Sequence, residues 1–265
     1  MSKERLLKRQ LVGVVLGCQI LLSFQSDLLA NDSKSQTSTP YQVSQVEEQS
    51  NVSVSYEFNL KTPVFSPSST YSALNGAIKS ARDDMIARVL GQGAVTTLNR
   101  SGVLDQSDAM QDAPPLKNSV TADFEVNQNN QLTSVVMNME GYVAPSAHPF
   151  HTINTFNFDI KKGSMVFLAD IFNQDARPLL LLSNLSREQL KAKNLPDQAT
   201  LIEGTAPLPS NFEHWLISSK GLVIYFDDYQ VAPYSSGQQT ITIPLDQLKP
   251  SLSPYGLQLS GIASE

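Results

Sequence analysis

The sequence predicts an α+β fold, in which antiparallel sheets carry helices packed on one face and a cleaved signal peptide precedes the folded part. Several stretches alternate apolar and polar residues, which is typical of half-buried strands. Other stretches place apolar residues at spacings of three and four, which is typical of amphipathic helices. Hydrophobic residues make up 41% of the 265-residue chain, which is enough to form a packed core.

Residues 1–30 have the pattern of a secretory signal peptide. Basic residues before position 10 precede an apolar run from Leu11 to Phe24, and we expect cleavage after Ala30. A membrane span needs about 20 apolar residues, so this run is short for a permanent anchor. We therefore expect an exported protein, periplasmic or secreted, that meets a membrane only through an N-terminal lipid or an uncleaved signal.

The single cysteine, Cys18, leaves two alternatives for the N-terminus. It follows Val15-Leu16-Gly17, which is similar to a lipobox, so Cys18 is a candidate for lipidation and the protein for a membrane-anchored lipoprotein. The residues after it are apolar, which favours a bystander inside the signal instead. In both cases the folded part has no free thiol, and a disulfide or a cysteine-ligated metal is excluded.

The first half of the chain predicts a strand, a helix and a hairpin. Residues 31–50 are polar and lack apolar periodicity, so we expect a disordered tether. Alternation from Val52 predicts a strand that ends near Pro63, and an apolar stripe predicts a helix from Ser68 or Ser69 to Gly91. Residues 92–118 are expected to form a loop. An antiparallel hairpin follows at 120–126 and 132–142 and completes an N-terminal module at 51–150.

The second half predicts a C-terminal domain at 151–250 and a tail at 251–265. Residues 152–160 and 165–168 are expected to form a hairpin that turns at Gly163, and residues 176–195 a helix that ends before Pro196. Alternation at 222–226 and 240–243, with bends at Pro233 and Gly237 between them, predicts a β-ribbon with a Tyr-rich corner.

Motifs in this second half resemble a known family. The corner fits the pattern Y-x-x-A-P-Y-x-x-G-x-x-x-x-x-I-P, and upstream segments resemble the series A-H-P, N-F-D, T-G-K and L-x-D-L-F in the same order. The fitting residues are Ala147-His148-Pro149, Thr155 to Asp159, Lys162-Gly163, Leu168 to Phe172, Tyr229, Ala232, Pro233, Tyr234, Gly237, Ile243 and Pro244. Roughly residues 142–248 thus resemble the C-terminal domain of unknown function shared by RsiV-type anti-sigma factors, which sense lysozyme, and PdaC-type peptidoglycan deacetylases. Pro145-Ser146 departs from the family's Gly-Gly.

Charge and resemblance together suggest a class of partner. The formal net charge of −6 disfavours nucleic acid and is compatible with a cationic partner, although acidity also simply keeps an exported protein soluble. The resemblance implies a lysozyme-like protein or peptidoglycan as the partner. No cofactor is expected.

Histidines and tyrosines are the candidate binding residues: His148, His151, Tyr229, Pro233, Tyr234 and Gly237. Two neighbouring histidines are too few ligands for a metal site. Asp227 and Asp228 are consecutive at a strand end and should point to opposite faces, which disfavours a carboxylate pair. Asp159 and Asp170 end strand-like runs and are interpreted as turn caps. Trp215 and Phe226 are expected in the core.

Three hypotheses follow for function. The first is a non-catalytic exported binding module of the bacterial cell envelope. The second is an enzyme that acts on peptidoglycan and uses His148 with Asp159 or Asp228 as acid and base. The third is a structural envelope protein whose partner is another subunit.

Overall fold

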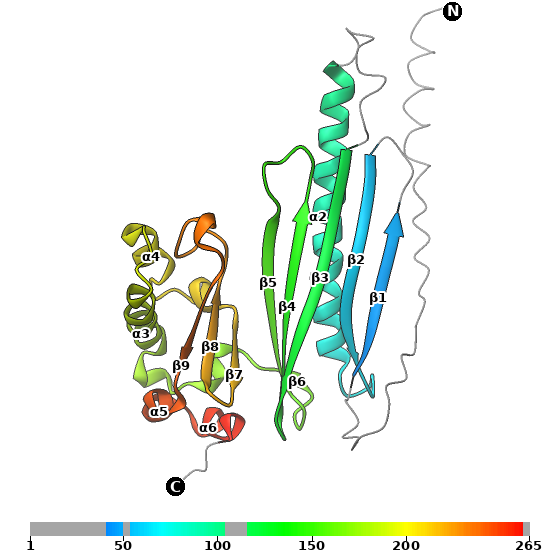
Figure 1. The fold of residues 1–265 in the computed structure, drawn as a ribbon. Helices are drawn as coiled ribbons and strands as arrows, with labels where there is room; N and C mark the ends of the chain where they lie inside the picture. The colour runs from blue at the N-terminus through cyan, green and yellow to red at the C-terminus, as the bar shows by residue number, and fades with distance from the viewer. Residues whose placement is uncertain (1–40, 50–53, 104–115, 262–265) are drawn as a thin grey trace, which may run out of the picture.

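The computed structural model describes residues 41–49, 54–103 and 116–261, which form two sheets with helices (Figure 1). The first sheet has six strands in the order β1-β2-β3-β4-β5-β6, and the second has three in the order β7-β8-β9. The α+β class and the predominance of antiparallel pairing are confirmed. The signal peptide and Cys18 lie outside the described residues.

The six-stranded sheet follows the order of the chain. Its neighbours pair antiparallel except β2 and β3, which pair parallel because the long helix α2 crosses over between them. The elements are β1 (Tyr41–Gln49), β2 (Val54–Phe65), α2 (Ser72–Val103), β3 (Leu116–Gln128), β4 (Leu132–Tyr142), β5 (Phe150–Asp159) and β6 (Ser164–Met165).

Helix α2 covers one face of this sheet, and the first core lies between them (Figure 1). Leu74, Ile78 and Val89 of α2 are at most 2% exposed, and they pack in one cluster with inward-facing residues of the strands such as Val120 and Met137. The opposite face of the sheet is thus left for the rest of the chain and for solvent.

The C-terminal part builds a second core around the three-stranded sheet. Trp215 and Phe226, which were expected in the core, are 3% and 0% exposed and belong to this cluster. The elements are α3 (Pro178–Ala192), α4 (Gln198–Gly204), β7 (Trp215–Ser218), β8 (Gly221–Phe226), β9 (Gln239–Ile243), α5 (Leu245–Leu248) and α6 (Pro254–Ser260), with short 3₁₀ segments η3 (Leu168–Ile171), η4 (Gln174–Ala176), η5 (Pro209–Phe212), η6 (Tyr234–Ser236) and η7 (Lys249–Ser251).

Strand β7 joins the two sheets. Leu216 packs on Val136 and Ile153, which lie on the face of the six-stranded sheet that α2 does not cover. Trp215 adds hydrogen bonds at the same place, because its backbone N–H donates to Thr155 Oγ1 at 3.0 Å and its carbonyl accepts from Asn157 Nδ2 at 2.8 Å. Helices therefore lie on the outer side of each sheet, and the two sheets meet along β5 and β7.

Three predicted segments were wrong in part. Residues 254–260 of the expected tail form α6, and Leu259 of this helix is buried in the second core. Residues 41–49 of the expected tether form β1, whose alternating Tyr41 and Val43 pair with β2. Helix α2 runs through Gly91 and Gly93 to Val103 instead of ending at Gly91. A Cβ atom at Gly93 would lie only 2.5 Å from Tyr56 Oη, so glycine here permits close packing on β2 and does not end the helix.

Most other predicted strand and helix bounds agree with the structure, and the module boundary remains a prediction. The two hairpins, the helix that begins near 176 and the two ribbon strands occur within a few residues of their predicted bounds. The module boundary at residue 150 stays a prediction, and β4 and β5 pair directly across it. No helix among the described residues is long and apolar enough to span a membrane.

Candidate functional site

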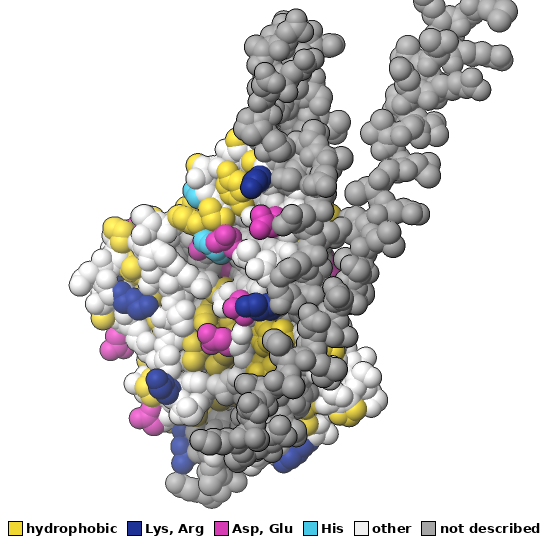
Figure 2. Space-filling model, turned by 45° about the vertical axis from the view of Figure 1, so that its right-hand side comes forward, with side chains coloured by type: hydrophobic (Ala, Val, Ile, Leu, Met, Phe, Trp, Pro, Cys, Tyr) yellow, Lys and Arg dark blue, Asp and Glu magenta, His cyan; other side chains and the backbone are white. Residues whose placement is uncertain are grey.

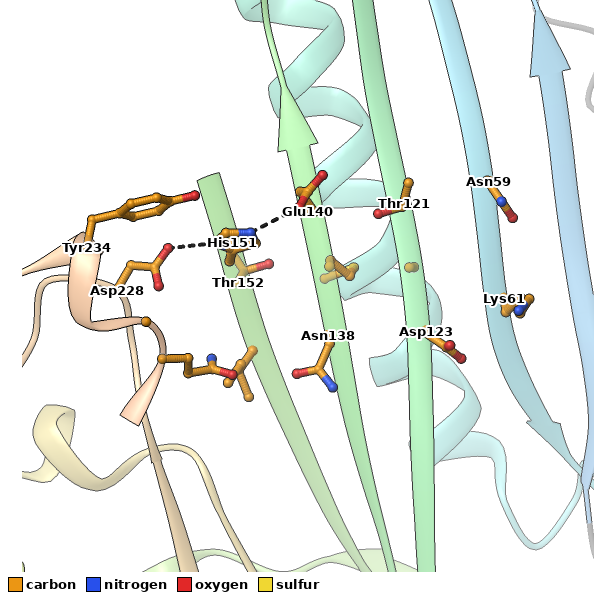
Figure 3. Close-up of a pocket in the computed structure, with 15 residues that line it drawn as sticks. Asn59, Lys61, Thr121, Asp123, Asn138, Glu140, His151, Thr152, Asp228 and Tyr234 are labelled. Atoms are coloured by element: carbon orange, nitrogen blue, oxygen red, sulfur yellow. Dashed lines mark hydrogen bonds and ion pairs between the residues drawn. The ribbon is translucent and has the colours of Figure 1, made fainter. Parts of the chain in front are cut away.

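A polar groove lies on the face of the six-stranded sheet that α2 leaves uncovered (Figure 3). It has a volume of about 600 Å³ and is closed on one side by the loop that connects β8 to β9. Fifteen residues line it: Asn59, Lys61, Thr121, Ala122, Asp123, Asn138, Met139, Glu140, His151, Thr152, Ile153, Asp228, Tyr234, Gly237 and Gln238.

The strand register arranges the polar side chains of the groove in rows. Asn59, Thr121, Glu140 and His151 are direct neighbours on β2, β3, β4 and β5, so they form one row across the sheet (Figure 3). Asp123 and Asn138 begin a parallel row two residues away. Because alternate residues of a strand share a face, these amides, hydroxyls and carboxylates all point into the groove.

His151 ends the first row and contacts a carboxylate on each side. Its Nε2 lies 3.0 Å from Glu140 Oε2 on β4, and its Nδ1 lies 2.9 Å from Asp228 Oδ2 in the loop after β8. A carboxylate only accepts hydrogen bonds, so both contacts are satisfied only when both ring nitrogens carry a proton. Partial burial acts to lower the pKa of His151, but the hydrogen bonds and charges of Asp228 and Glu140 outweigh it and raise the pKa above its ordinary value.

Tyr234 is the centre of an aromatic cluster at the same end of the groove. Its ring stacks on His148 with 4.2 Å between centroids, and on His151 and Tyr229 with 5.7 Å each. Its hydroxyl donates to the carbonyl of Pro149 at 3.3 Å. Figure 2 shows histidine side chains beside acidic and hydrophobic ones on this side of the molecule.

His148 completes the cluster from the segment before β5. Its Nδ1 lies 2.7 Å from the Pro149 carbonyl and therefore donates, since a carbonyl can only accept. In the neutral ring Nε2 is then the acceptor, and it faces the Tyr229 hydroxyl at 3.3 Å. The Ala147-His148-Pro149 segment and the Tyr-rich corner thus meet in space.

The loop that carries Tyr229 has an unusual backbone. Tyr229 has a φ of 66°, in the left-handed region that a bulky residue rarely occupies, and its side chain is 56% exposed. Such a conformation costs roughly 1 kcal/mol or more, and it is often found at ligand sites. Pro233 precedes η6, and Gly237 ends it with a φ of 66°. The two bends place Tyr234 and Gly237 at the groove.

The structure brings together the predicted candidates His148, His151, Tyr229 and Tyr234, with Pro233 and Gly237 in the same loop. It does not assemble the acid–base pairs expected around His148. Asp228 contacts His151 instead, and Asp159 is fully buried, where its Oδ2 accepts from Gln131 and Tyr255. Neither carboxylate forms a hydrogen bond or ion pair with His148, so the structure contains neither of the expected pairs.

The turn-cap interpretation of Asp159 and Asp170 is confirmed. Asp159 Oδ1 accepts from the backbone N–H groups of Lys161 and Lys162, and Asp170 accepts from the N–H of Phe167. Asp227 and Asp228 contact different histidines, because Asp227 lies 3.5 Å from His214. Their divergence agrees with the expected opposite directions.

Sequence reasoning missed the sheet-borne half of the site. Its members are Asn59, Lys61, Thr121, Asp123, Asn138 and Glu140. Their signal was available, since each occupies an outward position in a predicted strand, but only the register shows that they share a row. Within the described residues, no three His, Cys, Asp or Glu side chains converge as metal ligands.

Comparison with known proteins finds a family match in the C-terminal part of the chain. Residues 169–246 match the family model described as "Protein of unknown function (DUF3298)". The predicted resemblance is confirmed. Over 148 residues, or 55% of this chain, the sequence is 34% identical to peptidoglycan-N-acetylmuramic acid deacetylase PdaC of Bacillus subtilis (strain 168). The match covers 32% of that relative, so the chain spans about a third of its length.

Two crystal structures of DUF3298 proteins share the fold. One, from Bacteroides fragilis, has a TM-score of 0.59 and 19% identity, with 85% of this chain and 97% of that chain covered. The other, from Pseudomonas aeruginosa, has a TM-score of 0.51 and 14% identity, with 81% and 94% covered. At these identities the likeness concerns the fold alone. Both matches take in most of this chain, so they extend beyond residues 169–246.

Proposed function

We propose that the chain is an exported, non-catalytic binding module of the bacterial cell envelope, and that its groove holds a glycan strand of peptidoglycan. The observation that carries this proposal is the row of outward polar side chains on four strands, which ends at the aromatic ring of Tyr234. Amides and carboxylates can hydrogen-bond sugar hydroxyls, while an aromatic ring offers contact area with a polar handle. The similarity to a peptidoglycan deacetylase supports the choice of glycan.

A binding role fits the chemistry of the groove better than acid–base catalysis. Both ring nitrogens of His151 are engaged by carboxylates, so neither is available to take a proton from a substrate. The pair Glu140 and Asp228 is likewise engaged by the same imidazole. The imidazolium thus offsets one of the two carboxylate charges, and the three side chains organise the end of the groove.

Co-sedimentation with purified sacculi tests this function. We expect the protein to pellet with sacculi and to leave them intact, without released muropeptides. Asn138→Ala and Tyr234→Ala should each weaken binding about fivefold, as expected for loss of about 1 kcal/mol. Glu203→Gln, an exposed change on α4 outside the groove, is the matched control. Equal pelleting of all variants would contradict the role of the groove, and muropeptide release would favour the enzyme.

A lysozyme-like protein is the second candidate, and the exposed tyrosine favours it. Tyr229 is exposed beside His148, and the chain carries a formal net charge of −6, which suits a cationic protein. Calorimetric titration with lysozyme should then show binding that weakens as salt is raised. Tyr229→Ala should reduce it, while Asn138→Ala should leave it unchanged. Absence of heat at both low and moderate salt would reject this candidate.

A further inference from the structure

A second cavity, distinct from the groove, lies where the six-stranded sheet meets the C-terminal part of the chain. It has a volume of about 630 Å³, and its walls come from β5, β6, η3, the start of α3, η5 and β7. The packing of Leu216 on Ile153 and the hydrogen bond from the Trp215 N–H to Thr155 Oγ1 mark the seam along which β5 and β7 meet. No residue lines both the groove and this second space, named here the apolar cavity.

Hydrophobic side chains make up most of the wall of the apolar cavity. Phe172, Phe212 and Trp215 are at most 3% exposed, and Leu168 and Leu179 are partly exposed beside them. A concave space of this size with mostly apolar walls and few polar groups is typical of small-molecule sites.

The polar groups of the cavity are already satisfied, with one exception. Asn157 donates through Nδ2 to the Trp215 carbonyl and accepts from Ser134 Oγ, and Gln174 donates to the Ala169 carbonyl. Glu213 is the one charged residue of the lining. Within the described residues, its carboxylate makes no hydrogen bond or ion pair. A negative charge is therefore available at the edge of an apolar space.

Phe167 adds an exposed aromatic ring to the same wall. It is 68% exposed, although its backbone is held on both sides: its N–H donates to Asp170 Oδ2 at 2.8 Å, and its carbonyl accepts from the Asp170 N–H at 2.9 Å. A fixed backbone with an outward aromatic side chain presents apolar area that burial would favour. Exposed apolar surface next to a cavity is a common mark of a ligand site.

We infer that the apolar cavity binds a small cationic amphiphile, whose alkyl chain or ring enters between Phe172, Leu179 and Trp215 and whose positive end lies at Glu213. Phe167 covers the chain at the entrance. This inference is independent of the glycan proposed for the groove. The ligand is expected to be cationic because Glu213 is the charged residue of the lining. No Lys or Arg lines the cavity to receive an anionic head group.

Trp215 makes the test direct, because it is the single tryptophan of the chain and lines the cavity. The probe is a short alkyltrimethylammonium with bromine on its chain, which quenches tryptophan at contact and is used below its micelle concentration. We expect saturable quenching. The brominated alkyl carboxylate of the same length should bind about tenfold more weakly, a difference of about 1.4 kcal/mol. Non-saturable quenching, or equal quenching by both probes, would overturn the inference.

Three variants locate the binding. Glu213→Gln should bring the two probes to within about threefold of each other, and Phe167→Ala should weaken both. Ala169→Phe, on the exposed η3 segment, should fill the space and remove the quenching, with thermal unfolding showing that the variant is folded. Glu140→Gln in the groove should leave quenching unchanged. Loss in Glu140→Gln, or none in Phe167→Ala and Ala169→Phe, would contradict the site and point to surface adsorption or to a protein partner instead.

Discussion

The imidazole of His151, on β5, lies 2.9 Å from the carboxylate of Asp228, in the loop that follows β8, and so adds a polar contact between the six-stranded sheet and this loop. Glu140 holds the other ring nitrogen at 3.0 Å. The loop with Asp228 also carries Tyr229 and Tyr234, so the protonation state of one histidine is linked to the position of the aromatic cluster.

Stability should fall as pH rises through the titration of His151. Its pKa is higher in the folded state than in the unfolded chain, so its contribution is complete below about pH 6.5 and is lost above the folded-state pKa. The stability difference between the wild type and His151→Gln, measured by denaturant titration, should shrink as the pH rises above about 6.5. Because the side chain is 37% exposed, the effect should be small. A constant difference across this range would contradict the assignment.

Tyr229 should lower the stability of the fold through its backbone conformation and strengthen partner binding through its ring. Replacement by Gly removes the cost of a left-handed conformation, so Tyr229→Gly should be as stable as the wild type or more stable by about 1 kcal/mol. It also removes the ring that stacks on Tyr234, and binding of the partner should weaken. Asn also tolerates this conformation, so Tyr229→Asn should have the same effects on stability and binding. Thermal unfolding and the sacculus and lysozyme assays measure the two effects, and a clear loss of stability in both variants would show that the strain is absent.

Gly204 in α4 should be intolerant of any side chain. A Cβ atom there would lie 1.7 Å from the backbone carbonyl oxygen of Gln230, in the loop that carries Tyr229. Gly204→Ala should therefore destabilise the fold by about 2–4 kcal/mol or displace the loop. Gly76→Ala in α2 is the control, because no atom lies within 4 Å of its added methyl group and helix propensity should stabilise it by about 0.5–1 kcal/mol. Equal effects in denaturant titration would contradict the close approach.

Asp159 should stabilise the fold at neutral pH and fail to do so in acid. Burial acts to raise its pKa, but hydrogen bonds from Gln131, Lys162, Tyr255 and Lys161 outweigh this and lower the pKa below its ordinary value. Its contribution is thus present above about pH 4 and is lost as pH falls through the folded-state pKa.

Two variants measure the contribution of Asp159. Asp159→Asn should cost about 1–3 kcal/mol at pH 7, and Tyr255→Phe, which removes the 2.8 Å hydrogen bond from α6, about 1 kcal/mol. The cost of Asp159→Asn should diminish in acid, as followed by unfolding at several pH values. A pH-independent cost would indicate packing as its cause.

Much of the fold could be read from periodicity, because each strand half-buries its residues and the alternation is local. The end of α2 could not, since the packing of Gly93 on Tyr56 depends on residues far apart in the chain. Likewise, motif reading found the loop with Tyr229 and Tyr234 and the segment with His148. It missed Glu140 and Asn138, because an exposed polar residue in a strand becomes part of a site only through its neighbours on other strands.

The rows of the groove also place possible ligand contacts at regular spacing. Adjacent strands of a sheet are about 4.8 Å apart, so Asn59, Thr121, Glu140 and His151 offer contacts at a nearly constant pitch that no single side chain determines. A polymer with a matching repeat can contact several side chains of the row at once, whereas a short fragment contacts few. Substitution on one strand removes one contact and leaves the spacing of the others unchanged. The affinity should therefore depend more steeply on the length of the ligand than on any one residue.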